Sequence, residues 1–277
     1  MQPEHTLTTH PGHAITLAEQ AARKFDVVVA VGGDGTVLEV ATGLLLAVAT
    51  ETALGIVPFG TGNDVARMVG VNNVQAALET LRHGQPRAID VIEVRCHDGT
   101  KPIIRYALLF AAVGFASELI KHTTPRIKRL FGSRLCYSAG FFRALFSYRP
   151  SLMRVSCDGR SKQGRLFLAC AGNSEFAGGN VMHLSPGALV DDGLLNVSLI
   201  EMAGRWETAR QFFRLLRGTH IHHPNVRYFP ARSLSVASDA NIEVTLDGDI
   251  VGHTPATFEV KPKALNILAP SNFAHCA

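Results

Sequence analysis

The sequence contains no apolar run of the roughly 18–20 residues that a helix needs to cross a bilayer. The segment that comes nearest, residues 106–120, is interrupted by Ser117 and Glu118. Residues 1–20 also lack a basic stretch followed by an apolar core, which a secretory signal peptide would have. We therefore expect a soluble, cytoplasmic protein.

Cysteine is also scarce, because the 277 residues include only five and none of them forms a CxxC pair. Such scattered cysteines are typical of reduced thiols and argue against a disulfide framework or a zinc ribbon. No low-complexity tract is present, and a content of 47% hydrophobic and 18% charged residues is typical of a folded globular protein. The net charge of +4 is too small to indicate nucleic-acid binding by itself.

The first third of the chain alternates helix and strand patterns. Helical spacing and apolar β-branched runs predict helices at 13–25, 37–48, 64–70 and 72–84, and strands at 26–31 and 53–59. Helix and strand in turn, with short connections, indicate a parallel sheet that helices cover. The run at 26–31 is expected to be a buried strand of that sheet.

After about residue 91 the pattern changes to short alternating strands separated by turn signals. Strands are predicted at 90–96, 152–159, 165–173, 193–202, 233–238, 242–248, 256–262 and 264–270, with helical patches at about 126–146 and 203–217. This pattern is typical of an antiparallel sandwich or barrel. We therefore predict an α/β nucleotide-binding domain at 1–91 and a β-rich domain at 92–264. Whether residues 265–277 return to the first domain is left open.

Two glycine-rich loops follow the first two predicted strands. The stretch VGGDGT (31–36) places Asp34 after the first strand, and PFGTGND (58–64) places Asp64 after the second. One strand–helix–strand unit takes about thirty residues, so both loops are expected at the carboxyl end of one sheet, where ligands bind. In this interpretation the loops form a nucleotide site. The alternative is that both are merely tight turns.

Neither loop matches a standard phosphate-binding motif. The stretch GIVPFGT (55–61) has the glycine spacing of a P-loop but lacks the lysine that reaches the phosphates. The stretch GGDGTVL (32–38) lacks the third glycine of the dinucleotide fingerprint, and its acid lies inside the turn. A carboxylate at that position would repel a phosphate, so its presence requires an explanation.

The loops VGGDGTVLEVATGL and LGIVPFGTGNDVARMVG resemble the diacylglycerol kinase catalytic-domain family, which includes bacterial lipid kinases and sphingosine kinases. The resemblance continues through LLFAAVGFASELI, AGNSEFAGGNVMHLSPGALVDDGLLNV and VTLDGDIVG, and so covers nearly the whole chain. NAD kinases share only the first loop. The resemblance implies a three-layer α/β ATP-binding domain followed by a β-sandwich-like, lipid-binding domain.

The resemblance also implies a role for the acid in the first loop. Asp34 would hold Mg²⁺ through water, with support from Asp64, and the metal would bridge to the phosphates of ATP. The residues expected to contact ATP are Gly32, Gly33, Gly35 and Thr36, the amides of Val37 and Leu38 in the first helical turn, and the hydroxyl of Thr61. ATP and Mg²⁺ are therefore the expected cofactors.

The stretch LVDDGLL (189–195) carries a strong Asp-Gly turn signal, and taken alone it predicts a hairpin turn. The resemblance instead implies a second, structural Mg²⁺ site. Its ligands would be the carboxylate of Asp192 and the backbone carbonyls of Leu189 and Leu194, because hard cations accept such oxygens.

The stretch LDGD (246–249) places Asp247 and Asp249 two residues apart, so on one strand their side chains would face the same way. A hairpin turn at this Asp-Gly pair is the alternative. In the family, a glutamate at the second position is the general base for the lipid hydroxyl. The resemblance assigns that role to Asp249, with Asp247 assisting. Because Asp249 is one methylene shorter than glutamate, we expect an effect on rate more than on chemistry.

The sequence departs from the family before its first loop. Family members begin with a strand and an Asn-Pro loop that helps to grip the phosphates of ATP, whereas this chain reaches Asp34 without such a segment. We therefore expect a truncated ATP-binding domain, arising either from a misassigned start or in an inactive copy.

Residues 121–154 contain no acid and carry eight basic residues interleaved with Leu130, Phe131, Phe141, Phe142, Leu145 and Phe146. One interpretation is a solvated basic face above a core helix. The other is a membrane-contact patch, in which basic side chains meet anionic headgroups and aromatic rings enter the interface. No recognition motif accompanies the patch, so we do not expect nucleic-acid binding.

Two further features are expected to be structural. The stretch THIHH (219–223) contains three histidines, but no second ligand cluster with zinc spacing accompanies them. We expect this stretch to form a surface loop. Trp206 is expected to pack in the core of a helix rather than to bind a ligand.

Taken together, these patterns predict an ATP-dependent lipid kinase that acts at the inner face of the membrane as a peripheral protein; a homodimer is left open. One alternative is a non-catalytic lipid- or nucleotide-binding protein of the same fold. A second is a kinase for a water-soluble hydroxyl compound, against which the basic, aromatic run at 121–154 argues.

Overall fold

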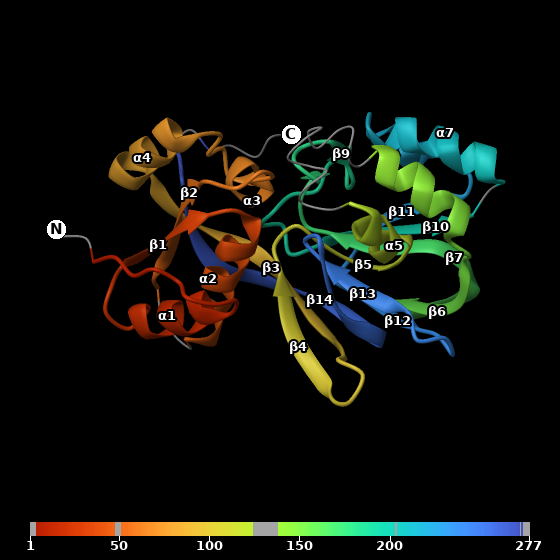
Figure 1. Cartoon of the computed structure of the whole chain (residues 1–277), viewed down its shortest axis with the longest axis horizontal. Helices are drawn as coiled ribbons and strands as arrows, with labels where there is room; N and C mark the ends of the chain where they lie inside the picture. The colour runs from red at the N-terminus through yellow and green to blue at the C-terminus, as the bar shows by residue number, and fades with distance from the viewer. Residues whose placement is uncertain (1–3, 48–50, 124–137, 203, 272, 274–277) are drawn as a thin grey trace.

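The computed structural model describes residues 4–47, 51–123, 138–202, 204–271 and 273. An α/β part lies at one end of the molecule and a β-rich part at the other, as Figure 1 shows. None of the helices in the described ranges is long and apolar enough to span a membrane.

The α/β part contains two parallel strands and four helices. They are β1 (Val27–Gly32), β2 (Ala53–Pro58), α1 (His13–Ala21), α2 (Asp34–Leu46), α3 (Asp64–Met68) and α4 (Val74–His83). The strands β1 and β2 pair in parallel from Val27↔Ala53 to Gly32↔Pro58. Asn73 caps the start of α4, because its side chain accepts a hydrogen bond from the Ala76 amide at 2.9 Å.

The strand β1 is not buried as the sequence suggested. It lies at the edge of the sheet and pairs only with β2 among the described residues. Val28 and Ala30 pack into the core shared with α2, whereas Val27, Val29 and Val31 on the other face are 36%, 38% and 61% exposed. The burial prediction was wrong for this face, because no described element covers it.

The β-rich part continues the same sheet, which has twelve strands in the described chain. Its strands are β3 (Gln85–His97), β4 (Pro102–Ala107), β5 (Phe110–Gly114), β6 (Ser151–Cys157), β7 (Arg160–Gly172), β10 (Leu195–Glu201), β11 (Val226–Ala231), β12 (Ser233–Ala237), β13 (Glu243–Leu246) and β14 (Asp249–Ala269). A separate two-stranded ribbon joins β8 (Phe176–Ala177) to β9 (Met182–His183). The predicted α/β part followed by a β-rich part is confirmed.

The long strands β3 and β14 pair antiparallel and connect the two parts of the molecule. The sequence suggested separate strands at 256–262 and 264–270, but both belong to β14, whose register shifts between Lys261 and Leu265. Lys263 adopts a left-handed φ of 52° at this irregularity. Farther along, Ile267 pairs in parallel with Leu54 of β2, so the end of β14 lies beside the α/β strands.

Helices cover one face of the β-rich sheet (Figure 1). They are α5 (Phe115–His122), the helical residues 138–147, α7 (Arg205–Leu215) and the short 3₁₀ helix η1 (Thr219–His222). The helical patch expected at 203–217 therefore corresponds to α7. Residues 126–137 of the patch expected at 126–146 lie outside the described part of the chain, whereas residues 138–146 are helical as expected.

Alternate residues of the central strands point into two different cores. Ala112 and Cys170 belong to the core that extends from α2 to α7, whereas Ala111 and Ala171 belong to a core enclosed by the β-rich sheet. Since successive side chains of a strand face opposite sides, the central part of the sheet is buried on both faces. This explains the nearly continuous apolar runs of β5 and β7.

Candidate functional site

The two glycine-rich loops meet at the carboxyl end of β1 and β2, as predicted. The Phe59 amide donates to the Gly32 carbonyl at 2.8 Å. A Cβ atom added to Gly60 would lie 2.4 Å from the Cα of Gly33. Two backbones in such close contact leave no room for a side chain, so both positions require glycine.

Asp34 begins helix α2 and faces the second loop. Its Oδ1 accepts a hydrogen bond from the Val65 amide, at the start of α3, at 3.0 Å. Burial raises the pKa of this carboxyl group above its usual value, and the neighbouring Asp64 raises it further. Asp34 therefore joins the two loops, and its charge is disfavoured by burial and by the neighbouring carboxylate of Asp64.

Asp64 connects the α/β part to the loop between β8 and β9. Its two oxygens accept hydrogen bonds from the amides of Gly179 and Asn180, at 2.7 and 2.8 Å, and its side chain is 8% exposed. Arg67 lies 3.7 Å from one of these oxygens. The structure thus gives Asp64 a loop-ordering contact that the sequence did not suggest.

The free amides at the start of α2 differ from those expected. The Val37 amide donates to the Gly33 carbonyl at 3.0 Å, inside the helix, so Val37 does not offer a free donor. The unpaired donors of a first helical turn precede this bond, which here means Asp34, Gly35 and Thr36. Gly35 is exposed, and no atom lies within 4 Å of a Cβ atom built on it.

The remaining residues expected at the ATP site lie around this helix start. The Thr36 hydroxyl would be 2.7 Å from a Cβ atom on Gly32, so Thr36 packs over the end of β1. The side chain of Leu38 is half-buried and packs against the core, so its role is structural. Thr61 is exposed in the second loop.

Asp247 and Asp249 are separated by a tight turn rather than lying on one strand. Leu246 pairs with Asp249, and the two residues between them, Asp247 and Gly248, both have left-handed φ angles, of 47° and 105°. The expectation that the two carboxylates face the same way was therefore wrong, and the alternative of a hairpin turn is correct.

The carboxylate of Asp247 is held by three consecutive backbone amides. Leu108 donates to Oδ2 at 2.7 Å, while Leu109 and Phe110 donate to Oδ1 at 3.0 and 2.8 Å. Burial raises the pKa of Asp247 to about 6 despite these bonds, and the charge of Asp34 adds to the rise. Asp247 therefore titrates close to neutral pH.

Asp249 has a different environment. Its side chain is exposed and makes no hydrogen bond or ion pair with any other described residue. Partial burial nevertheless raises the pKa of its carboxyl group. Asp249 does not line the cavity that Asp247 lines, so the structure brings Asp34, Asp64 and Asp247 together and leaves Asp249 beside them.

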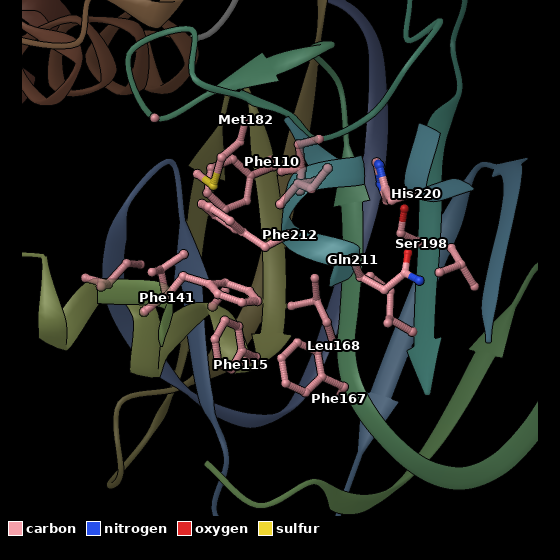
Figure 2. Close-up of a pocket in the computed structure, with 18 of the residues that line it drawn as sticks. Phe110, Phe115, Phe141, Phe167, Leu168, Met182, Ser198, Gln211, Phe212 and His220 are labelled. Atoms are coloured by element: carbon pink, nitrogen blue, oxygen red, sulfur yellow. The ribbon is translucent and has the colours of Figure 1, made fainter. Parts of the chain in front are cut away.

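A cavity of about 160 Å³ extends from these carboxylates into the β-rich part. A water molecule needs about 15 Å³ measured in this way, so the space suits a ligand of on the order of ten waters and is no packing defect. Figure 2 shows the aromatic side chains of its wall, which include Phe110, Phe115, Phe141, Phe167 and Phe212. The arrangement places acids beside an apolar chamber.

The stretch expected to bind a second Mg²⁺ forms a loop around a buried acid, Asp90. The Asp90 carboxylate accepts hydrogen bonds from the Gly193 and Lys263 amides at 2.6 and 2.8 Å, and its side chain is fully buried. Burial raises the pKa of Asp90, and Asp192 contributes to the rise. Sequence reasoning missed Asp90, although an acid inside the apolar run DVIEV was a usable signal.

Within that loop, Asp192 is exposed and its Oδ1 accepts a hydrogen bond from the Leu194 amide at 2.9 Å. Leu189 and Leu194 are both half-buried. The described residues contain no group of three or more histidine, cysteine or acidic side chains arranged to hold a metal ion. A Mg²⁺ ion bound here would therefore depend mainly on backbone oxygens and water, together with Asp192.

Two expectations about single stretches were wrong. The histidine stretch is not a surface loop, because His220 and His223 are only 3% and 9% exposed. Trp206 is not in a helix core, since it is 80% exposed on α7, whose buried face is formed by Thr208 and Phe212. In both cases the packing of α7 and η1 against the sheet decides which side chains are covered.

The basic, aromatic run divides into three groups. Arg126, Lys128, Arg129, Leu130, Phe131 and Arg134 lie outside the described residues. Lys121 pairs with Glu243 at 2.6 Å and Arg154 pairs with Asp239 at 3.1 Å. Phe141 and Leu145 belong to the core, whereas Phe146 is 59% exposed. Two of the apolar residues expected at an interface are thus core residues.

Comparison with known proteins agrees with this architecture. Residues 1–94 match the model of the diacylglycerol kinase catalytic domain, and residues 112–269 match that of the YegS C-terminal NAD kinase beta sandwich-like domain. The chain is 30% identical to a diacylglycerol kinase of Bacillus subtilis (strain 168), over 96% of this chain and 86% of that protein. It is 28% identical to a diacylglycerol kinase of Staphylococcus aureus (strain JH9), over 95% and 81% of the two chains.

The fold also has a counterpart among solved structures. A protein of Bacillus anthracis str. Sterne, proposed to be a diacylglycerol kinase, superposes with a TM-score of 0.78 at 24% sequence identity. The alignment covers 96% of this chain and 84% of that one. At this level of identity the likeness concerns the fold alone.

Proposed function

Because the chain belongs to the diacylglycerol kinase catalytic-domain family, a family of kinase enzymes, we propose that it transfers the γ-phosphate of ATP to the hydroxyl group of diacylglycerol or a related lipid. The observation that carries this proposal is the cavity, which is lined by Asp34, Asp64 and Asp247 and continues between aromatic walls. A reaction between a polyphosphate and an apolar alcohol requires such a combination of surfaces.

The glycine-rich loops supply the ATP end of the proposed site. The start of α2 presents free amides at Gly35 and Thr36, and the positive end of the helix dipole attracts phosphate. The contact between Gly33 and Gly60 keeps this surface free of side chains, so that phosphate can approach the backbone closely.

The acids of the site suit Mg²⁺. This ion takes one or two carboxylates together with water and substrate phosphates, so it needs no cluster of protein ligands. The pKa values of Asp34 and Asp247 are both raised, first by burial and then by a neighbouring carboxylate, and a cation would relieve this repulsion. When bound, Mg²⁺ would neutralise phosphate charge; Asp34 would hold it, while Asp64 orders the adjoining loop.

The proton of the lipid hydroxyl is assigned to Asp249. Its carboxylate is free of partners among the described residues and lies next to a turn that Asp247 fixes through three backbone amides. General-base catalysis requires the base within about 2.6–3.2 Å of the proton it removes. Asp247 is accordingly the positioning residue, and Asp249 accepts the proton.

The exposed aromatic side chains suggest how the lipid is reached. Phe146, Trp206 and Phe213 are 59%, 80% and 55% exposed, and α7 also carries Arg210 and Arg214. Exposed rings beside basic residues are typical of surfaces that lie in a membrane interface. We include peripheral contact with the inner face of the membrane, through α7 and residues 138–147, in the proposal.

The test is to incubate the chain with labelled ATP, Mg²⁺ and diacylglycerols of several chain lengths in mixed micelles. Labelled phospholipid is expected from the wild type and is expected to disappear in Asp249→Asn. Transfer to water-soluble alcohols without micelles would support the kinase for a water-soluble substrate instead.

A non-catalytic protein of the same fold is the second candidate, because Asp249 lies outside the cavity lining. That candidate binds ATP or lipid without producing phospholipid. A calorimetric measurement of ATP binding, made in parallel with the transfer assay, separates the two candidates. ATP binding without phosphate transfer favours the non-catalytic protein.

A further inference from the structure

A group of polar side chains lies in the wall of the apolar cavity, away from the carboxylates. Ser198 comes from β10, Gln211 from α7 and His220 from η1, and Figure 2 shows the three together at one side of the labelled aromatic rings. Ser198 and His220 are only 1% and 3% exposed. The proposed kinase reaction assigns no role to any of them.

Two polar atoms of this group, the Ser198 hydroxyl and the Gln211 Oε1, have no hydrogen-bond partner among the described residues. The ring nitrogens of His220 make no hydrogen bond of ordinary geometry there, although the backbone of Leu184 approaches the ring. A buried polar atom without a partner costs stability, whereas an apolar residue of similar shape would not. A ligand that enters the cavity would supply the missing partners.

The orientation of the Gln211 amide is fixed by its neighbours. Its Nε2 donates to Glu207 at 3.0 Å, and His223 Nε2 lies 3.3 Å from the same carboxylate oxygen. A carboxylate can only accept, so the amide nitrogen must face Glu207 and the oxygen must face the cavity. Gln211 thus presents an acceptor that only a donor can satisfy.

His220 presents both kinds of group. Burial lowers its pKa to about 4, and the nearby His183 and His222 lower it as well, against a smaller opposite effect from the backbone of Leu184. At neutral pH the ring is uncharged, with one nitrogen as donor and the other as acceptor. Ser198 likewise can donate and accept.

The register of the sheet separates this group from the acids. Ser198 lies opposite Cys170 of β7, Cys170 opposite Ala112 of β5, and Ala112 opposite Thr245 of β13. Three strand spacings of about 4.8 Å place Ser198 roughly 14 Å from Thr245, which lies two residues before Asp247. A group bound at Ser198 is therefore not the hydroxyl that reacts.

We propose that Ser198, Gln211 and His220 form a subsite for a second, unreactive hydroxyl group carried on the hydrocarbon chain of the lipid. A hydroxyl donates one hydrogen bond and accepts others, which matches the acceptor of Gln211 and the mixed groups of Ser198 and His220. A carbonyl offers no donor for Gln211. A carboxylate or phosphate would meet no Lys or Arg among the described residues that line the cavity, and would lie near Glu207. The placement of the lipid's hydrocarbon chain in the cavity rests on the proposed function.

The first experiment measures binding without ATP, so that it does not depend on turnover. The probes are diacylglycerols that differ only in the position of a single hydroxyl along one acyl chain, presented in mixed micelles to the wild type. One position is expected to bind about tenfold more tightly than the unhydroxylated lipid, the gain of one or two satisfied hydrogen bonds. Equal affinity at every position would overturn the proposal.

Variants test whether these side chains cause the preference. Ser198→Ala and Gln211→Met keep the shapes and remove the polar atoms, and each is expected to abolish most of the tenfold preference. Thr208→Val is the matched control, because Thr208 lines the same cavity but its hydroxyl lies 3.3 Å from the Gly204 carbonyl, which accepts its hydrogen bond. If Thr208→Val removed the preference equally, the subsite would not be at Ser198 and Gln211.

The lipid-free protein provides a second readout. Ser198→Ala is expected to leave the melting temperature unchanged or to raise it, since it removes a buried hydroxyl that lacks a partner. A clear fall would show that this hydroxyl is satisfied by internal water as part of the fold, and would overturn the proposal.

The proposed kinase activity and the subsite fail in different ways. Tight binding of one hydroxylated lipid with no phosphate transfer would contradict the kinase proposal and support the subsite. Transfer to all lipids alike, with no difference between the wild type and Ser198→Ala, would support the kinase and contradict the subsite.

Discussion

At one end of the cavity each of the three carboxylates that line it accepts hydrogen bonds from backbone amides, whereas at the other side the Ser198 hydroxyl and the Gln211 Oε1 have no partner among the described residues. Asp34, Asp64 and Asp247 each hold a loop in place. Ser198, Gln211 and His220 hold no loop. The difference indicates that the backbone of the protein fixes each acid in place, while the polar group is left to the ligand of the proposed subsite.

Removal of the proposed base should have the largest effect on the acid end. In Asp249→Asn, kcat for lipid phosphorylation is expected to fall by about 10²–10⁴-fold, the usual contribution of a general base, with ATP binding unchanged. The measurement is steady-state transfer in mixed micelles. Asp239→Asn is the control, because Asp239 is an exposed acid whose one ion pair within the described part of the chain is with Arg154. Wild-type turnover in Asp249→Asn would place the base elsewhere.

Loss of a loop-holding acid should cost stability. In Asp90→Ala the amides of Gly193 and Lys263 lose the buried carboxylate that accepts their hydrogen bonds. Each unsatisfied group costs about 1–3 kcal/mol, so the free energy of unfolding should fall by about 3 kcal/mol. Urea unfolding measures it. Asp98→Ala is the matched control, because Asp98 also accepts backbone amides but is exposed, so water can replace it. Equal losses in both variants would contradict the role of burial.

The pH dependence of stability should reveal Asp247. Its pKa in the folded protein is raised from 3.8 to about 6, so between these values the folded chain binds a proton that the unfolded chain has lost. The stability contributed by this proton is present below about pH 4 and is lost as pH rises to 6, by at most about 3 kcal/mol.

The comparison that isolates this group is between the wild type and Asp247→Asn, unfolded with urea at several pH values. The wild type should lose stability relative to the variant as pH rises from 4 to 6 and run parallel to it above pH 7. Parallel curves over the whole range would mean that Asp247 has an ordinary pKa.

Substitution within the polar group should change the free energy of unfolding in the opposite direction to substitution of a loop-holding acid. Ser198→Ala in the lipid-free protein is expected to raise the free energy of unfolding by about 1 kcal/mol, because a buried hydroxyl without a partner is removed. Differential scanning calorimetry measures it, with Thr208→Val expected to be destabilising. A loss of stability in Ser198→Ala would remove the contrast between the two ends.

The smallest effect on stability concerns the exposed aromatic surface. Trp206→Ala should change the free energy of unfolding by less than about 0.5 kcal/mol, since the ring is 80% exposed, and should weaken co-sedimentation with anionic vesicles. Phe212→Ala on the same helix should cost about 3–5 kcal/mol, because Phe212 is 1% exposed. Unchanged vesicle binding in Trp206→Ala would contradict the proposed membrane contact.

Much of the α/β part could be predicted from local patterns. The runs at 26–31 and 53–59 form parallel strands, and the loops after them meet, because a strand–helix–strand unit leaves little freedom in where the next loop falls. The turn signal at Asp247-Gly248 was also present in the sequence, but only pairing between β13 and β14 distinguished a turn from a strand.

The contacts that complete the site could not be predicted in this way. Asp64 binds amides more than a hundred positions away, at Gly179 and Asn180, and Asp247 binds those of Leu108 to Phe110. The position of a carboxylate in the sequence does not indicate which distant backbone amide it will bind in the fold. For the same reason the burial of His220 and the exposure of Trp206 were not foreseen.

The sequence by itself determined the family, the order of an α/β part and a β-rich part, and the two glycine-rich loops, because these depend on residues close together along the chain. The tertiary structure alone decided which acids share the cavity, which face of β1 stays uncovered and which histidine is buried. Those properties depend on how distant elements pack. Packing brings Ser198, Gln211 and His220 to one cavity from three separate elements.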